Sequence, residues 1–330
     1  MTRVPWLVTM LCKPRCGIPA VAQLLGLLAL FSGLGFAATN RPTDRKCLTQ
    51  NVTQWQMLNV SPGHEQADCH LIVLPDGRNV LIDIGEAADA PGAALAALKA
   101  AKVTRLDLVI ISHFHVDHYG RLLDLIDSGV QIKRVAVNVP DEATARAEQP
   151  WGCSYDDVLA TLAGLRKRGV PYFTPAAGDC LIESTVDGRS LAKLEVVCLY
   201  QGLNAPMGPT DVNDTSIILR LTHGANRTLF TGDLNHGLGT WLATSKFDLA
   251  ADVLKVPHHG TEACAPDEFF DRVHPTAALV PGPKSLWASG RSMRIRNYFA
   301  SHAIPTYVSG MNGNVTVTFK GDTYSIESER

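Results

Sequence analysis

Residues 106–118 read LDLVIISHFHVDH, and this stretch decides the fold. Its first six residues are almost wholly apolar, which is typical of a strand that is buried on both faces. Its last six residues place His113, His115, Asp117 and His118 directly after that strand. Imidazole nitrogens and carboxylate oxygens, bound at about 2.0–2.2 Å, are the ligands that Zn²⁺ and similar ions take. The stretch therefore predicts a buried strand that ends in a metal site.

The spacing HxHxDH in residues 113–118 resembles the signature of the metallo-β-lactamase superfamily. Farther along, residues 213–221 (NDTSIILRL) and 254–260 (LKVPHHG) are similar to segments of the ComEC/Rec2-type hydrolase domains within that superfamily. The resemblance covers residues 54–327. It implies an α/β fold, the four-layer αββα sandwich, and a single hydrolase domain over residues 39–330.

The resemblance also implies a cofactor of two divalent ions, with Zn²⁺ expected and Mn²⁺ as the alternative. We expect histidines and aspartates at several strand ends to hold these ions. The expected ligands are His113, His115, Asp117, His118, Asp233 and His258. Asp233 would bridge the two ions, because one carboxylate has two oxygens. Asp117 would also hydrogen-bond the nucleophile, and His259 would face the substrate or transfer a proton.

Two further expectations concern the surroundings of the ions. Many relatives place a third histidine on the first ion, but this chain has none between His118 and His223. We expect Asn213, Asp211 or Asp214 to face that ion instead, and a turn role without metal contact is the alternative for Asn213. Asp83 ends a predicted strand, and the resemblance implies that it orients a metal-bound histidine; helix capping is the alternative.

The remaining pattern alternates strands with helices, which predicts sheets covered by helices. The predicted helices include residues 91–101, 155–168, 266–273 and 293–302. Hairpins are expected over residues 180–200 and 221–228. His223 lies in the turn of the second hairpin, so we expect it at the surface.

The N-terminus reads as an export signal. Three basic residues precede an uncharged run at residues 18–38, and this run ends in small residues. The pattern predicts cleavage after Ala37 or Ala38 and a periplasmic or secreted location. An uncleaved membrane anchor is the alternative, and it would be the only membrane contact.

Six cysteines follow residue 38, and an exported protein often pairs its cysteines. Cys153 and Cys180 flank the predicted helix at residues 155–168, so a disulfide between them is the favoured pairing. The cysteines show no metal-binding spacing in this part of the sequence.

The charge balance limits the partners. Residues 1–37 hold three of the 30 Lys and Arg residues, and the rest of the chain carries 27 basic and 32 acidic groups, a net charge of −5. That balance argues against a broad nucleic-acid-binding face. Within residues 281–296, four cations would meet an anionic substrate or form a solvated helix face; these are Lys284, Arg291, Arg294 and Arg296.

These features together predict an exported hydrolase that uses metal-activated water. The ComEC-type resemblance favours a phosphodiesterase or nuclease, so the expected partner is a small-molecule or phosphodiester substrate, with DNA included. One alternative is a hydrolase of lactones, β-lactams or other carboxylic esters. The other is a metal-binding protein without catalysis.

Overall fold

A computed structural model describes residues 51–330, except 149–151, 201–203, 206–207 and 210. The predicted export signal at residues 1–38 lies outside this part of the chain. No helix among the described residues is long and apolar enough to cross a membrane.

The first sheet contains strands from both ends of the described chain. These strands are β1 (Val52–Met57), β2 (Cys69–Val73), β3 (Asn79–Ile84), β5 (Leu108–Ile111), β7 (Val135–Val137), β8 (Tyr172–Phe173), β18 (Val315–Lys320) and β19 (Thr323–Ser328). Their spatial order is β19-β18-β1-β2-β3-β5-β7-β8. The central strand β5 is parallel to both neighbours, β3 and β7, and all four of its residues are buried. This placement explains why the sequence there is continuously apolar rather than alternating.

The second sheet is built from the C-terminal half. Its strands are β9 (Cys180–Val186), β10 (Arg189–Cys198), β13 (Ile218–His223), β14 (Asn226–Phe230), β15 (Val253–Lys255), β16 (Ala277–Val280) and β17 (Thr306–Val308). They follow the order β17-β16-β15-β14-β13-β10-β9. The strands from β14 to β17 are parallel to one another, and the others pair in antiparallel fashion. Two short pairs complete the strands of the described chain, β4 (Arg105–Leu106) with β6 (Gln131–Ile132) and β11 (Asn204–Ala205) with β12 (Gly208–Pro209).

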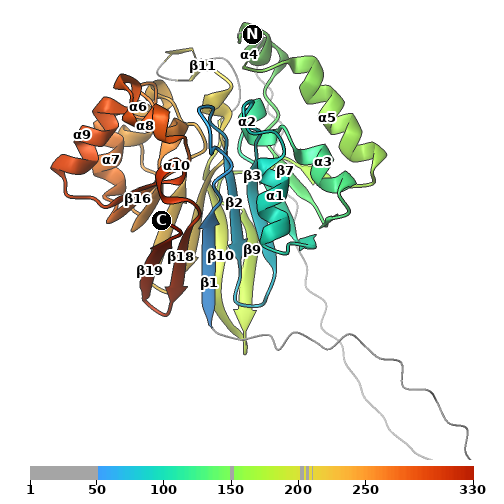
Figure 1. Cartoon of the computed structure of the whole chain (residues 1–330), viewed down its shortest axis with the longest axis horizontal. Coiled ribbons are helices and arrows are strands. Elements are labelled where there is room, and N and C mark those ends of the chain that lie inside the picture. The colour runs from blue at the N-terminus through green and yellow to red at the C-terminus, as the bar shows by residue number, and fades with distance from the viewer. Residues whose placement is uncertain (1–50, 149–151, 201–203, 206–207, 210) are drawn as a thin grey trace, which may run out of the picture. The chain divides into compact units, whose positions relative to one another are not determined.

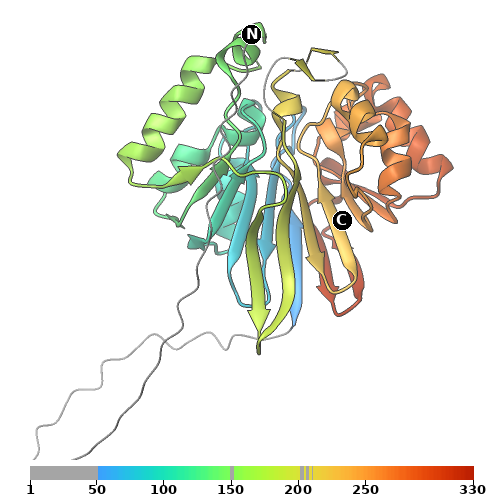
Figure 2. The same ribbon diagram turned by 180° about the vertical axis from the view of Figure 1, so that it is seen from behind.

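The helices divide into two sets according to their position in the chain. The first set is α1 (Ala93–Ala100), α2 (Val116–Tyr119), α3 (Leu122–Asp127), α4 (Glu142–Ala147) and α5 (Tyr155–Lys167). The second set is α6 (His236–Thr244), α7 (Asp267–Val273), α8 (Lys284–Ala288), α9 (Met293–Ser301) and α10 (Ser309–Asn312). In Figure 1 the teal to green helices α1, α3 and α5 flank one side of the strands, and the orange helices α6, α7 and α9 flank the other. The reverse view shows the same division (Figure 2).

Three separate apolar clusters show that these parts form four layers. One cluster joins the first sheet to α1, α3 and α5 through residues such as Leu98, Leu125 and Leu165. A second lies between the two sheets and includes Trp55 and Phe230. The third joins the second sheet to α6, α7 and α9. Helix, sheet, sheet and helix therefore pack in that order, which confirms the predicted αββα sandwich.

Two expectations from the sequence are wrong. Cys153 and Cys180 are not paired, because Cys153 is buried under the first helical layer while Cys180 is exposed at the start of β9 in the other sheet. His223 is buried rather than exposed, and its Nδ1 lies 2.8 Å from the hydroxyl of Thr53. His223, at the end of β13, thus packs against β1, while the turn residues Gly224 and Ala225 are exposed.

Candidate metal centre

The polar residues found in the sequence come from strand ends that meet at one edge of the sandwich. Asp83 is the second-last residue of β3, and residues 113–118 follow β5, the parallel neighbour of β3. Asp233 follows β14, and residues 257–260 follow β15, also parallel neighbours. Because the carboxyl ends of parallel strands open at the same edge, all four segments can converge. The backbone bond from Ile217 N–H to the carbonyl of Ser112 (2.9 Å) joins the two sheets at this point.

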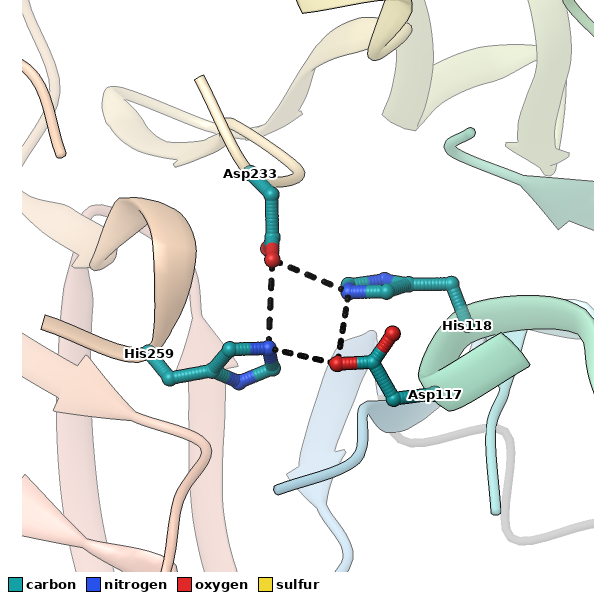
Figure 3. A group of neighbouring side chains, drawn as sticks. All are labelled: Asp117, His118, Asp233 and His259. Atoms are coloured by element: carbon teal, nitrogen blue, oxygen red, sulfur yellow. Dashed lines mark hydrogen bonds and ion pairs between the residues drawn. The ribbon is translucent and has the colours of Figure 1, made fainter. Parts of the chain in front are cut away.

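Four side chains form a closed ring at this edge (Figure 3). Asp233 Oδ2 lies 3.2 Å from His118 Nε2 and 3.1 Å from His259 Nε2. Asp117 Oδ2 lies 3.2 Å from His259 Nε2 and 4.0 Å from His118 Nε2. Ligand atoms bound at about 2.0–2.2 Å to one tetrahedral ion are about 3.4 Å apart. The spacing around the ring therefore suits a single divalent ion.

Both histidines of the ring are held from behind at Nδ1, so that Nε2 faces the ring. His118 Nδ1 lies 2.9 Å from Asp83 Oδ2, and His259 Nδ1 lies 2.7 Å from the carbonyl of Pro281. An Nδ1–H that donates to a carboxylate or carbonyl fixes the tautomer in which Nε2 can bind a metal. Asp83 thus makes the contact expected of it, and it does not cap a helix, because α1 has Gly92 at its N-cap.

Buried opposite charges surround the ring. Burial alone would lower the pKa of His118, but Asp233 and Asp68 outweigh it and raise this pKa. Burial alone would raise the pKa of Asp233, but His118, His259 and Lys255 outweigh it and lower it. A divalent ion and the histidine protons would compete for the same nitrogens, as in other sites where metal binding releases protons.

The structure reverses the expected placement of the two neighbouring histidines. His259 lies in the ring, and His258, which the sequence suggested as the ligand, lies outside it. His258 Nδ1 is 2.6 Å from Asn235 Oδ1, and burial lowers the pKa of His258 to about 4. Both histidines have positive φ, 47° and 52°. In this left-handed backbone the alternation of a strand no longer decides which side chain faces the site.

His113 and His115 lie beside the ring without belonging to it. The imidazole centroids of His113 and His115 are 4.8 Å apart, and those of His113 and His118 are 4.1 Å apart. His113 Nδ1 lies 3.1 Å from the hydroxyl of Ser112. The Nε2 atoms of His113 and His115 are buried and have no hydrogen-bond partner. A buried nitrogen without a partner is costly, and an ion would satisfy both of these.

The three residues proposed to replace the missing histidine have different surroundings. Asp211 Oδ2 accepts a hydrogen bond from Asn235 Nδ2 (2.6 Å), and its Oδ1 accepts from Asp214 N–H. Asp214 Oδ1 accepts from Asn235 N–H (3.1 Å), and burial with Asp211 nearby raises the pKa of Asp214 to about 7. Asn213 is buried in a short 3₁₀ turn, and its Oδ1 has no hydrogen-bond partner.

Sequence reasoning missed a buried ion pair behind the ring. Lys255 Nζ lies 2.6 Å from Asp68 Oδ2 and 3.3 Å from Asp233 Oδ1, and it donates to the carbonyl of Gly232 at 2.7 Å. Both Lys255 and Asp68 are at most 2% exposed. The signal for Lys255 was a cation inside the apolar run at residues 253–256. Nothing in the local sequence distinguished Asp68.

The four cations of residues 281–296 have mainly structural contacts. Arg294 pairs with Asp267 at 2.5 Å, and Arg291 lies 3.3 Å from Glu262. Arg296 donates to the carbonyl of Ser289 at 2.7 Å, and Lys284 is exposed. These contacts favour a surface helix stabilised by local bonds over a substrate-binding cluster.

The chain is similar to several known proteins. The sequence model of the metallo-beta-lactamase superfamily matches residues 62–263. ComE operon protein 3 of Bacillus subtilis (strain 168) is 22% identical over 231 residues, which cover 69% of this chain but 27% of that protein. The metallo-beta-lactamase fold protein YhfI from Bacillus subtilis is 12% identical, covering 83% of this chain and 99% of its own, with a TM-score of 0.45. Igni18, a metallo hydrolase from the archaeon Ignicoccus hospitalis, is also 12% identical, covering 81% and 99%, with a TM-score of 0.43.

Proposed function

Because the chain belongs to the metallo-beta-lactamase superfamily, we propose that it is an exported metal-dependent hydrolase of phosphodiesters. The observation that carries this proposal is the ring of Asp117, His118, Asp233 and His259 at the carboxyl ends of the strands. Two imidazole nitrogens and two carboxylates make a donor set that Zn²⁺ or Mn²⁺ accepts. We assign the second ion to this ring, with His259 as the ligand in place of His258.

The first ion is assigned to His113 and His115, whose Nε2 atoms are buried without partners. Bound divalent ions would supply an activated water and stabilise the charge that develops during hydrolysis. Asp117 would accept a hydrogen bond from the nucleophile, because its carboxylate borders the ring and is 17% exposed. Asp83 would hold the imidazole of His118 in place, so that Nε2 of His118 faces the ion. His258, held by Asn235 through Nδ1, would present Nε2 to the substrate.

Two observations support a small phosphodiester over a long nucleic acid. The chain after residue 37 has a net charge of −5, so no broad positive field would attract DNA. A cleft of about 570 Å³ next to α4 and α5 includes Glu148, Asp156 and Asp157 in its lining, with Arg146 as the basic residue. An acidic cleft of this kind would repel a polyanionic strand.

The test is hydrolysis of bis-p-nitrophenyl phosphate and of single- and double-stranded DNA, with Zn²⁺ or Mn²⁺ added. We expect metal-dependent turnover of the small ester, and a loss of roughly 100-fold or more in kcat for Asp117→Ala. His236→Ala is the matched control, because His236 lies at the start of α6 outside the ring. If the protein binds two ions but hydrolyses no phosphodiester, the proposed substrate class is wrong and carboxylic esters, lactones and β-lactams come next.

Export is proposed from the sequence of residues 1–38. Expression of the full chain, followed by N-terminal sequencing of the protein outside the cytoplasm, tests it. A new N-terminus at residue 38 or 39 is the expected result. Protein that stays in the cytoplasm with Met1 in place would contradict export.

A further inference from the structure

The first ion of the proposed function lacks a third protein ligand, and this inference rests on that function. Glu148 follows directly after α4, and no expectation from the sequence involved it. Its Oε2 lies 3.7 Å from His115 Nε2. We propose that Glu148 is a carboxylate ligand of the first ion and takes the place of the histidine that the sequence lacks.

The orientation of Glu148 supports this assignment. Glu148 Oε1 accepts a hydrogen bond from the backbone N–H of Val212 at 2.7 Å. Val212 is fully buried in the apolar cluster between the first sheet and its helices. The hydrogen bond to its N–H therefore fixes the carboxylate between α4 and the 3₁₀ turn at residues 213–215. The second oxygen, Oε2, is left facing His115. The side chains of Glu148 and His115 are only 14% and 12% exposed.

The distance between the two atoms also fits. Two ligand atoms bound at about 2.0–2.2 Å to one ion lie about 3.0–3.5 Å apart. At 3.7 Å, Glu148 Oε2 and His115 Nε2 need to approach by only a few tenths of an ångström. His115 Nε2 has no hydrogen-bond partner, so its 3.7 Å contact with Glu148 Oε2 is not a hydrogen bond. An ion between the two atoms would satisfy both.

Two of the three competing candidates already have hydrogen-bond partners. Both carboxylate oxygens of Asp211 accept hydrogen bonds from neighbouring residues. Asp214 has a raised pKa and bonds to the backbone of Asn235. Asn213 has an unpartnered Oδ1, so it is the competitor that the experiment must include.

The set His113, His115 and Glu148 is less tightly assembled than the ring. Among the described residues, its donor atoms do not all lie within the 4.8 Å that unites Asp117, His118, Asp233 and His259. The first ion should therefore bind more weakly than the second. Exchanging an imidazole for a carboxylate also shifts the first site toward harder ions such as Mn²⁺.

The experiment measures the number of ions bound rather than activity. The purified protein is loaded with Co²⁺ or Zn²⁺ and dialysed, and its metal content and the Co²⁺ absorption spectrum are recorded. We expect two ions in the unmodified protein and one in Glu148→Gln, with affinity for the lost ion reduced by roughly tenfold or more. Glu142→Gln removes an exposed carboxylate of α4 that pairs with Arg146, and it should keep both ions.

The outcomes separate this inference from the proposed function. The ion that Glu148→Gln retains in the ring reports that the variant is folded. If the unmodified protein and Glu148→Gln both bind two ions with equal affinity, Glu148 is not a ligand. The proposed two-ion site would then remain supported. Loss of one ion in Asn213→Ala but not in Glu148→Gln assigns the ligand to Asn213. Fewer than two ions in the unmodified protein would overturn both the pair and the role of Glu148.

Discussion

Lys255 is a buried cation beside the candidate metal centre. Burial alone would lower its pKa, but Asp68 and Asp233 outweigh burial and raise it. Lys255 Nζ lies beside Oδ1 of Asp233, while Oδ2 faces both histidines of the ring. Asp233 therefore has one oxygen engaged with the protein and one turned to the ring. This arrangement argues against a bridge that uses one oxygen for each ion.

The pair of Lys255 and Asp68 should behave as a buried unit. Lys255→Met leaves the Asp68 carboxylate buried without its cation, and we expect a loss of about 3–5 kcal/mol in the free energy of unfolding. The double variant Lys255→Met/Asp68→Asn removes both charges and should recover most of that loss. Urea unfolding followed by circular dichroism measures both. A double variant as unstable as the single one would show that the two residues are not coupled.

Asp214 should make the stability of the metal-free protein depend on pH. Its folded pKa of about 7 is above the ordinary value of 3.8. The folded state therefore holds a proton that the unfolded chain releases, and this contribution is complete below about pH 4 and lost as the pH rises through 7. Asp214→Asn should match the unmodified protein at pH 4 and exceed it by roughly 2–4 kcal/mol at pH 8.

Denaturation with EDTA present, at pH values from 4 to 8, tests the role of Asp214. Asp187→Asn is the control, because Asp187 is exposed in the turn between β9 and β10. This control should follow the unmodified protein at every pH. If Asp214→Asn does the same, the buried carboxyl does not carry the pH dependence.

The end of β3 and the start of α2 approach each other so closely that only glycine fits between them. A Cβ on Gly85 would lie 1.6 Å from the carbonyl oxygen of Asp117. Gly85→Ala should therefore displace Asp117, reducing kcat by roughly tenfold or more and the free energy of unfolding by about 1–3 kcal/mol. Gly290→Ala has no atom within 4 Å of the new methyl group and should change neither. Normal activity in Gly85→Ala would show that this contact does not position Asp117.

Elements with a strong local pattern were predictable. The apolar run before His113 predicted β5, since a strand with parallel neighbours on both sides is buried on both faces. The hairpin turn at Asp187 was predictable as well, because Asp followed by Gly adopts positive φ easily. The buried position of His223 was not predictable, because it depends on a contact with Thr53, in a strand far away in the sequence.

The candidate site was predictable where the candidate ligands follow directly after strands. Asp117, His118 and Asp233 lie together as the strand ends implied. The order of His258 and His259 depends on two successive left-handed residues, and no local pattern gives their φ values. Asp68 and Glu148 reach the site through contacts with segments that are distant in the sequence, Lys255 and His115. No local pattern therefore selects either of them.

At the scale of the whole molecule, the ring is a connection between the two sheets. Asp117 and His118 follow β5 of the first sheet, whereas Asp233 and His259 follow β14 and β15 of the second. Ions bound to these residues would hold the sheets together, and ligands that bind only the folded state stabilise it. We expect chelation to lower the Tm by several degrees in proportion to metal affinity. Thermal melts with and without EDTA measure the shift, and Asp117→Ala should show a smaller one.

The same connection determines when the ring can form. Asp117 and His259 are 142 residues apart in the chain, so the ring exists only after both sheets have formed and docked. Such distant contacts form late, and interactions absent from the transition state slow unfolding without speeding folding. Bound ions would thus lengthen the lifetime of the native protein and leave its refolding rate unchanged. Under the proposed export, that lifetime would decide how long each molecule survives outside the cell.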